Sequence, residues 1–372
     1  MFGWATSWKN LLHGITRLDN LNVEEKNVLR KKCEYLIEIL SDPQIQTDDN
    51  RNHPIWSFFY YPQCISLMGE LGESIYCLKS KENFDEIITR LISKTEFWGA
   101  YYEIRSGKIL FDARLKFDYI KRLKKKKTPD ISYLNNREIN FEITHMDHSK
   151  CFTDAYNCYN KLKGFLYEKF KSGDLDFYCN ISDPIMTQKQ IDDIILKIQE
   201  LITIAEKQGC AKLHSYPGID FFVFTEERQF DVPIKYRVEH YKMPFTYERP
   251  RIEKKIEEKH EKCNDKTPNI IMIFDQNIDS DDDMKKVNEN LKNDLLKQIN
   301  LCENLSAVII YTEFFPVKED RSDYFEETDE YIGIKNFDKI MARTRSVLII
   351  INKQCNYPLN NEEIELLKKL FV

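Results

Sequence analysis

Residues 128–144, which read TPDISYLNNREINFEIT, decide the fold of this chain because they encode two strands and the turn between them. Pro129 has no amide hydrogen and holds the residue before it extended, so it starts a strand and presents Asp130 at a defined point. Leu134–Asn136 are expected to form the hairpin loop, since asparagine tolerates positive φ. The return strand is expected over 138–144.

The return strand alternates, so Glu142 and Thr144 share one face with Asn140. A three-residue loop places Asp130 opposite Asn140 and diagonal to Glu142 on this face. A two-residue loop places Asp130 opposite Phe141, on the other face. A pair of carboxylates on one face of the hairpin requires the first register.

A third carboxylate, Glu103, lies upstream on a helix expected over 94–109. One helix and two neighbouring strands would then deliver three carboxylates, and oxygen ligands are what Mg²⁺ or Mn²⁺ prefers. Taken singly, Pro-Asp before a strand and a glutamate on a polar strand face are ordinary features. Their combination predicts metal-assisted phosphodiester cleavage.

The order of these motifs resembles divergent members of the PD-(D/E)xK nuclease superfamily: Glu103 on a helix, then TPD at 128–130, then an E-x-T strand at 142–144. The likeness covers residues 97–144 and, by order of elements, extends to Thr312. It implies an α/β, restriction-endonuclease-like fold, with a mixed sheet flanked by helices. Carried onto this chain, the implied ligands of Mg²⁺ or Mn²⁺ are Glu103, Asp130 and Glu142.

The chain departs from the superfamily at Thr144, which stands where the usual lysine would be. That lysine stabilises the attacking hydroxide or the developing phosphate charge, so another cation has to replace it. Lys161 and Lys163 on the next helix are candidates. Lys259 is preferred, because residues 251–259 look like the helix that precedes the last core strand in similar proteins. The resemblance therefore implies a catalytic set of Glu103, Asp130, Glu142, Thr144 and Lys259.

Charge is distributed unevenly along a chain whose formal net charge is -6. Ten basic residues lie between Arg105 and Lys127 against two acids, and binding to phosphates depends on local Lys and Arg density. This segment either guides a nucleic acid across the carboxylates or forms a solvated lysine loop, and the sequence leaves both open. The residues expected to contact nucleic acid are Arg114, Lys116, Lys121, Arg122, Lys124, Lys125, Lys126 and Lys127.

Strands and helices alternate along most of the chain, which indicates an α/β layered sheet. The expected organisation is a helical N-terminal region (1–93), a core (94–312) with an insertion at about 172–249, and a C-terminal α/β extension (313–372). Further helices are expected at 23–40, 83–93, 151–171, 187–208, from 250 onward, 284–302, 337–343 and 362–370. Further strands are expected at 115–119, 176–181, 219–225, 270–274, 307–312 and 347–351.

No apolar run reaches membrane-spanning length, the N-terminus has no cleavable signal, and the ten cysteines include no CxxC pair. These features predict a cytoplasmic protein that does not enter the membrane. The expected function is that of a metal-dependent nuclease, and the resemblance adds defence or restriction as its context. DNA is favoured over RNA as the partner, and a homodimer or larger complex is left open. The alternative is a catalytically degenerate nuclease fold that binds nucleic acid or another partner without cleaving it.

Overall fold

The structure, a computed structural model, describes most of the chain as two compact units. Unit 1 comprises Met1–Asp147 with Arg249–Val372, and unit 2 comprises His148–Glu248. The described residues are 8–16, 18, 21–40, 53–55, 64–122, 128–134, 136–146, 150–170, 174–182, 185, 187–212, 218–225, 238–241, 249–263, 265–275, 293–314, 324–327, 331–338 and 343–371.

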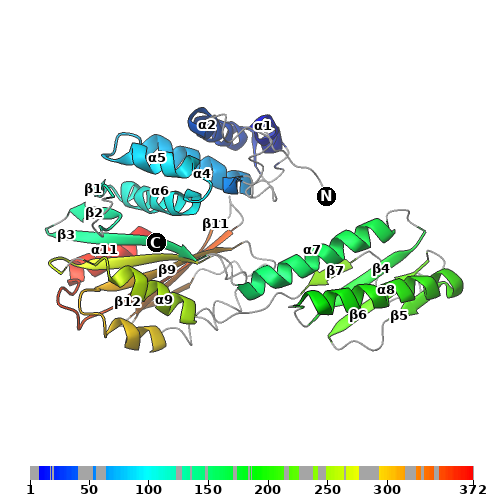
Figure 1. The fold of residues 1–372 in the computed structure, drawn as a ribbon. Helices are drawn as coiled ribbons and strands as arrows, with labels where there is room; N and C mark the ends of the chain where they lie inside the picture. Colours follow the sequence, from blue (N-terminus) through cyan, green and yellow to red (C-terminus); the bar gives the residue numbers. More distant parts are fainter. Residues whose placement is uncertain are drawn as a thin grey trace. The chain divides into compact units, whose positions relative to one another are not determined.

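Eight described strands form one mixed sheet in unit 1 (Figure 1). They are β1 Phe117–Tyr119, β2 Ile131–Leu134, β3 Glu138–Met146, β8 Asn269–Asp275, β9 Ala307–Phe314, β10 Tyr324–Glu327, β11 Tyr331–Asp338 and β12 Arg343–Ile351. Their order is β1-β2-β3-β8-β9-β12-β11-β10. Strands β3, β8 and β9 run parallel, and the other neighbours are antiparallel. The expected α/β class, with a mixed sheet flanked by helices, is confirmed.

Helices cover both faces of this sheet. They are α1 Trp8–Thr16, α2 Val23–Leu40, α4 Cys64–Leu78, α5 Phe84–Ile92, α6 Phe97–Asp112, α9 Arg249–His260 and α11 Asn361–Phe371. Figure 1 shows α4, α5 and α6 on one side of the sheet and α9 on the other. Because α6 and α9 both contact β3, side chains from opposite layers converge on this strand.

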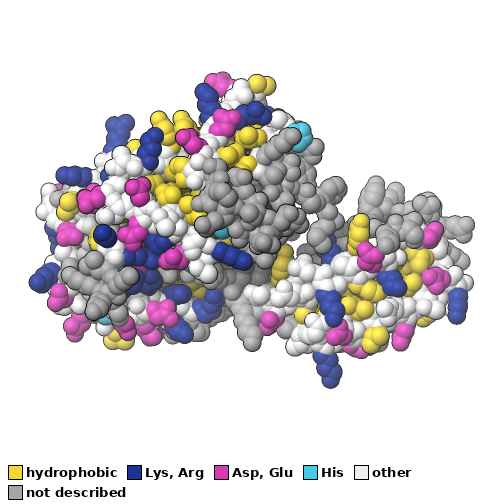
Figure 2. Space-filling view, turned by 45° about the horizontal axis from the view of Figure 1, so that its top comes forward, with side chains coloured by type: hydrophobic (Ala, Val, Ile, Leu, Met, Phe, Trp, Pro, Cys, Tyr) yellow, Lys and Arg dark blue, Asp and Glu magenta, His cyan; other side chains and the backbone are white. Residues whose placement is uncertain are grey.

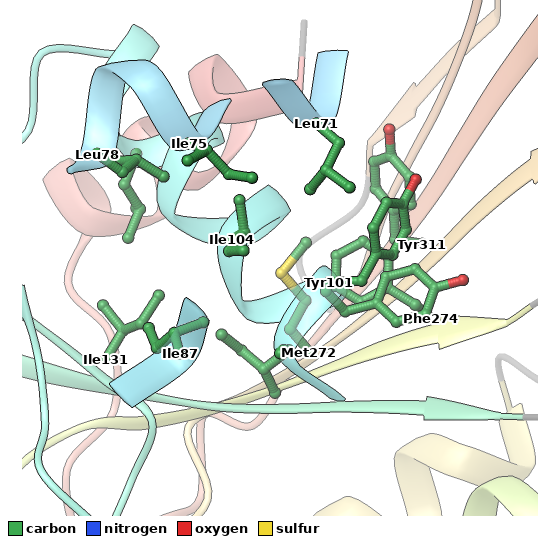
Figure 3. Close-up of a cluster of buried hydrophobic side chains, with 14 of the residues drawn as sticks. Leu71, Ile75, Leu78, Ile87, Tyr101, Ile104, Ile131, Met272, Phe274 and Tyr311 are labelled. Atoms are coloured by element: carbon green, nitrogen blue, oxygen red, sulfur yellow. The ribbon is translucent and has the colours of Figure 1, made fainter. Parts of the chain in front are cut away.

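The main hydrophobic core lies between the sheet and the α4–α6 layer. Ile75 of α4, Ile104 of α6 and Met272 of β8 are at most 2% exposed and lie in one cluster (Figure 3). Burial of each such side chain contributes about 1.5–3 kcal/mol relative to exposure. This apolar layer anchors α6, and with it Glu103, against the hairpin strands.

The N-terminal helices pack closely onto one another and into the same core. The helix expected at 23–40 is confirmed, and Leu29, Cys33, Leu36 and Leu40 of α2 are buried along one of its faces. Gly72 of α4 allows the closest approach, because a Cβ at this position would lie 2.0 Å from a backbone oxygen of α2. The helical region 1–93 is thus continuous with the core of unit 1.

Unit 2 has its own four-stranded sheet and its own core. Its elements are α7 Lys150–Phe170, β4 Asp176–Ile181, α8 Gln188–Gln208, β5 Cys210–Lys212, β6 Ile219–Phe224 and β7 Val238–Tyr241. Helix α8 begins with a capping box between Thr187 and Gln190, and ends at Gly209 with a φ of 81°. The expected helix at 187–208 is confirmed with both ends. We expected the insertion to start near 172, but α7 packs with α8, and so the compact unit starts at 148.

The C-terminal region differs most from expectation. Residues 337–343 were predicted to be helical, and this is wrong: β11 extends through Asp338 and β12 begins at Arg343. Antiparallel pairing along eight residue pairs outweighs the weak local preference. Because β9 pairs with β12, residues 313–372 continue the core sheet instead of forming a separate extension. Of the helix expected at 284–302, residues 293–299 are helical and 276–292 lie outside the described residues.

Two surface properties bear on partners. Figure 2 shows Lys and Arg side chains interspersed with Asp and Glu over the face in view. No helix among the described residues is long and apolar enough to cross a membrane. Local clusters of charge therefore matter more to recognition than the total does.

Candidate functional site

Asp130 is held at the entrance of β2 by its own backbone. Its amide donates to the carbonyl of Phe141 at 3.0 Å, and its carbonyl accepts from Ile120 at 3.0 Å. Its carboxylate is buried, with Oδ2 accepting from the amide of Ile143 at 2.8 Å and Oδ1 accepting from Arg122 Nη2 at 3.1 Å. The Pro-Asp motif thus fixes this acid between β1 and β3.

The hairpin register differs from both alternatives drawn from the sequence. Strand β2 runs through Leu134, which pairs with Glu138, so the three connecting residues are 135–137 instead of 134–136. Ile131 pairs with Phe141, and the amide of Asp130, the residue before β2, donates to the carbonyl of the same Phe141. The shift of one residue in the loop moves the register by two residues, so Ser132 lies opposite Asn140. Asp130 is still close enough to Glu142 to raise the pKa of that acid.

Glu142 is 3% exposed, and its carboxylate accepts hydrogen bonds from two lysines. Its Oε1 accepts from Lys259 Nζ at 2.5 Å and also from Lys262. Lys259 Nζ is 3.4 Å from the carbonyl oxygen of Ile143 as well. Among the described residues, no hydrogen-bond partner reaches Glu142 Oε2. A buried carboxylate oxygen without a partner is a costly arrangement that a bound cation would relieve.

Glu103, the third acid predicted to bind metal, forms ion pairs with two arginines. Arg90 of α5 donates a hydrogen bond to each carboxylate oxygen of Glu103, and Arg122 Nη2 lies 2.6 Å from Glu103 Oε1. Across the described part of the chain, no three His, Cys, Asp or Glu side chains form a cluster that could hold a metal ion. Glu103 is instead connected to Asp130 through Arg122, which contacts both acids.

Ion pairs join seven side chains into two groups: Arg90, Glu103, Arg122 and Asp130 in one, and Glu142, Lys259 and Lys262 in the other. The groups form one charge network, because Asp130 acts electrostatically on both Glu142 and Lys259. Burial raises the pKa of Glu142, Asp130 raises it further, and the two lysines oppose this. The pKa of Glu103 is likewise raised by burial and by Asp130, against Arg90 and Arg122. These acids are costly to ionise unless a cation lies beside them.

Of the three candidate lysines, Lys259 is the one that the structure places beside the acids. Burial lowers the pKa of Lys259, but the carboxylates of Glu142 and Asp130 outweigh burial and leave it above its ordinary value, so the ammonium stays charged. Lys161 is on α7 in unit 2 and pairs with Asp192 at 2.5 Å. Lys163 is an exposed residue of the same helix. Thr144 is buried on the face of Glu142, two residues further along β3.

The expected nucleic-acid contacts are only partly described. Arg114, Lys116 and Lys121 are exposed on the segment that runs from α6 through β1. Arg114 has a φ of 58°, because it ends α6 in the left-handed conformation, with Leu115 bonding back to Leu110. Arg122 is part of the charge network. Residues Lys124–Lys127 lie outside the described residues.

Sequence reasoning missed two cations of the network. Lys262 follows Lys259 by three residues, a spacing that places both on one side of a helical turn, so this pair could have been read from the sequence. Arg90 carried no such signal, since it lies on the buried face of α5 where an aliphatic residue is usual. Only packing of α5 against α6 reveals its role.

No protein-family model matches this chain, and no curated protein matches it at a significant level. The function therefore has to be argued from the geometry of Asp130, Glu142 and the cations around them.

Proposed function

We propose that this protein is a metal-dependent nuclease with a restriction-endonuclease-like fold of the PD-(D/E)xK type. The single observation that carries the proposal is the pair of buried carboxylates Asp130 and Glu142, close enough for Asp130 to raise the pKa of Glu142. Lysines contact Oε1 of Glu142, and no hydrogen-bond partner among the described residues reaches its Oε2. The order α6, β1, β2, β3, α9, β8 supports the same family resemblance. Unit 2 then lies between β3 and α9 in the sequence as an insertion.

The donor atoms at this position suit Mg²⁺ or Mn²⁺. Hard divalent cations prefer oxygen donors, and this position offers the Asp130 carboxylate, the Ile143 carbonyl and Oε2 of Glu142, which has no partner among the described residues. A bound ion of this kind polarises a phosphoryl oxygen and lowers the pKa of a water ligand. Asp130 and Glu142 would hold it, and the amide of Ile143 would keep the Asp130 carboxylate oriented.

Lys259 takes the role that the usual lysine of the superfamily has, in place of Thr144. Its ammonium is already beside Glu142 and is kept charged there, so it can stabilise negative charge that develops on a phosphate. Glu103 keeps Arg122 beside Asp130 in the metal-free protein and is itself held by Arg90. The role of Glu103 as a metal ligand is not part of this proposal.

Nucleic acid, DNA in preference to RNA, is the proposed substrate. The exposed cations Arg114, Lys116 and Lys121 extend from the site along the α6–β1 segment and would bind phosphates. The proposal places the reaction in the cytoplasm, where free thiols such as Cys33 and Cys158 are stable. Assembly as a homodimer or in a larger complex is compatible with it.

A second candidate function is a catalytically degenerate module that binds nucleic acid without cleaving it. The observation that favours it is the pairing of Asp130 Oδ1 with Arg122, which gives the would-be metal ligand a protein partner. The substitution of the usual lysine by Thr144 points the same way. Both functions use the same basic surface, so binding alone does not separate them.

Cleavage assays with labelled DNA and RNA in Mg²⁺, Mn²⁺ or EDTA separate the two functions. We expect metal-dependent cleavage that is abolished in Glu142→Gln and in Asp130→Asn, because each removes a charged ligand. Glu138→Gln is the matched control: it lies on the same strand and face, where it accepts from Ser132 at 2.7 Å. This variant should cleave like the wild type.

Binding of nucleic acid without cleavage in either metal would establish the degenerate module instead. Cleavage that persists in EDTA and survives both Asp130→Asn and Glu142→Gln would contradict the metal site itself. A matching loss of activity in Glu138→Gln would mean that the strand, not the carboxylate pair, is sensitive to substitution.

A further inference from the structure

The four cations of the network differ in their access to solvent. Side-chain exposure is 10% for Arg90 and 18% for Lys259, against 27% for Lys262 and 41% for Arg122. Arg90 and Lys259 are therefore inner cations, and Arg122 and Lys262 are outer cations. The two outer cations come from different elements, the β1–β2 connection and the turn after α9, and each contacts one acid of the Asp130–Glu142 pair.

We propose that Arg122 and Lys262 are exchangeable cations, which occupy the acids in the metal-free protein and transfer to two phosphates of the nucleic acid when metal binds. This inference rests on the proposed nuclease site and names its substrate contacts and their coupling to metal. The assigned phosphate-binding residues are one arginine beside Asp130 and one lysine beside Glu142. Neither transfer requires a backbone element to leave the fold.

Each acid keeps another hydrogen-bond donor when its outer cation leaves. When Arg122 leaves, Glu103 still has Arg90 on both carboxylate oxygens, and Asp130 still has the amide of Ile143. When Lys262 leaves, Lys259 remains on the same oxygen of Glu142. No departure therefore leaves an acid without any partner, which is the costly outcome for a buried charge.

Charge balance links these departures to both metal and substrate. The network contains four cations and three carboxylates, so its formal charge is +1 without metal. A divalent ion raises this to +3, and a buried excess of positive charge is unfavourable. Two phosphodiester groups, each with one negative charge, restore +1. Metal and nucleic acid should consequently bind with positive cooperativity, and each should tighten the other by the same factor.

The test measures Mn²⁺ binding to the full-length protein by calorimetry, with and without a fully phosphorothioate-substituted DNA duplex, which keeps the charge and slows cleavage. For the wild type we expect the duplex to tighten Mn²⁺ binding roughly tenfold, and Mn²⁺ to tighten duplex binding equally. This measurement needs no variant, so it does not depend on whether a substitution folds.

Substitution of Arg122 and Lys262 tests whether these two cations cause the coupling between Mn²⁺ binding and duplex binding. Arg122→Gln and Lys262→Gln should each bind Mn²⁺ more tightly than the wild type in the absence of duplex, because a competing cation is gone, and should show weaker coupling. Lys255→Gln is the matched control, since Lys255 lies on α9 and pairs with Glu258, which is not one of the three acids of the network. It should bind Mn²⁺ like the wild type.

The possible failures are distinguishable. If the wild type binds Mn²⁺ equally with and without duplex, or if both Gln variants bind it like the wild type, the exchange is overturned while the proposed nuclease site stands. If no Mn²⁺ binds to any of these proteins, with or without duplex, the metal site and the exchange both fail.

Discussion

Arg90 and Glu103 form a buried, bidentate ion pair, and this pair sets what the neighbouring residues can do. Both side chains are at most 10% exposed, so neither finds water if the other is removed. A buried ion pair adds little stability over an apolar pair, but breaking it by removing one partner is strongly destabilising. At the scale of single residues, the pair therefore fixes α5 against α6 and provides Arg122 with a stable anchor.

We expect Arg90→Ala to lower the free energy of unfolding by about 3 kcal/mol, at the low end for a buried pair because Arg122 still contacts Glu103. Urea unfolding measures this change. Arg30→Ala, an exposed arginine on α2, should change it by less than about 0.5 kcal/mol. Equal effects of the two substitutions would mean that the pair has no special role.

At the scale of elements, the start of α8 shows how local chemistry specifies a boundary. Thr187 has extended backbone angles and accepts from the amide of Gln190 at 3.2 Å, while the Gln190 side chain accepts from the amide of Thr187 at 3.0 Å. Two of the amides that a helix start leaves without partners are satisfied in this way. The helix then buries Ile191, Ile194 and Ile198 against the sheet of unit 2.

Replacing Thr187 by Ala should lower the stability of unit 2 by about 1 kcal/mol, the usual cost of a lost cap. Thermal or urea unfolding, followed by circular dichroism, provides the measurement. Thr203→Ala, within the same helix, serves as control, since the Thr203 hydroxyl donates to the carbonyl of Gln199 four residues earlier and caps no helix end. A cost as large for Thr203→Ala would argue against a specific capping contribution.

At the scale of the whole molecule, the described residues form two hydrophobic cores. The core of unit 1 joins the N-terminal helices, the hairpin, the parallel strands and the C-terminal strands. The core of unit 2 is formed by α7, α8 and its own sheet, including Leu162, Ile198 and Phe221. Because each core is complete in itself, each unit meets the main requirement for independent folding.

We therefore expect a fragment of residues 148–248 to fold by itself with a cooperative unfolding transition, measured by urea titration and circular dichroism. Its size of about 100 residues is typical of a domain. A fragment that stays unfolded would show that unit 2 depends on unit 1 for its stability.

Much of the fold could be predicted from the sequence because its signals are local. The periodicity of α2 and α8, the cap at Thr187, the ending at Gly209 and the buried run of β8 depend on residues close together in the chain. Strand alternation likewise placed Glu142 and Thr144 on one face of β3. The choice of Lys259 over other lysines rested on the helix before β8, and the structure places it on Glu142.

The tertiary structure alone decided how these parts meet. Hairpin register depends on which three residues form the loop, and a shift of one residue placed Ser132 instead of Asp130 opposite Asn140. The partner of Glu103 is a buried arginine on another helix, and long-range ion pairs leave no local pattern. The strands after 313 joined the core sheet through pairing with β9, which no local preference encodes. Sequence determined the elements and their faces, and the tertiary structure determined which charges share a buried site, because burial and pairing are properties of distant residues brought together.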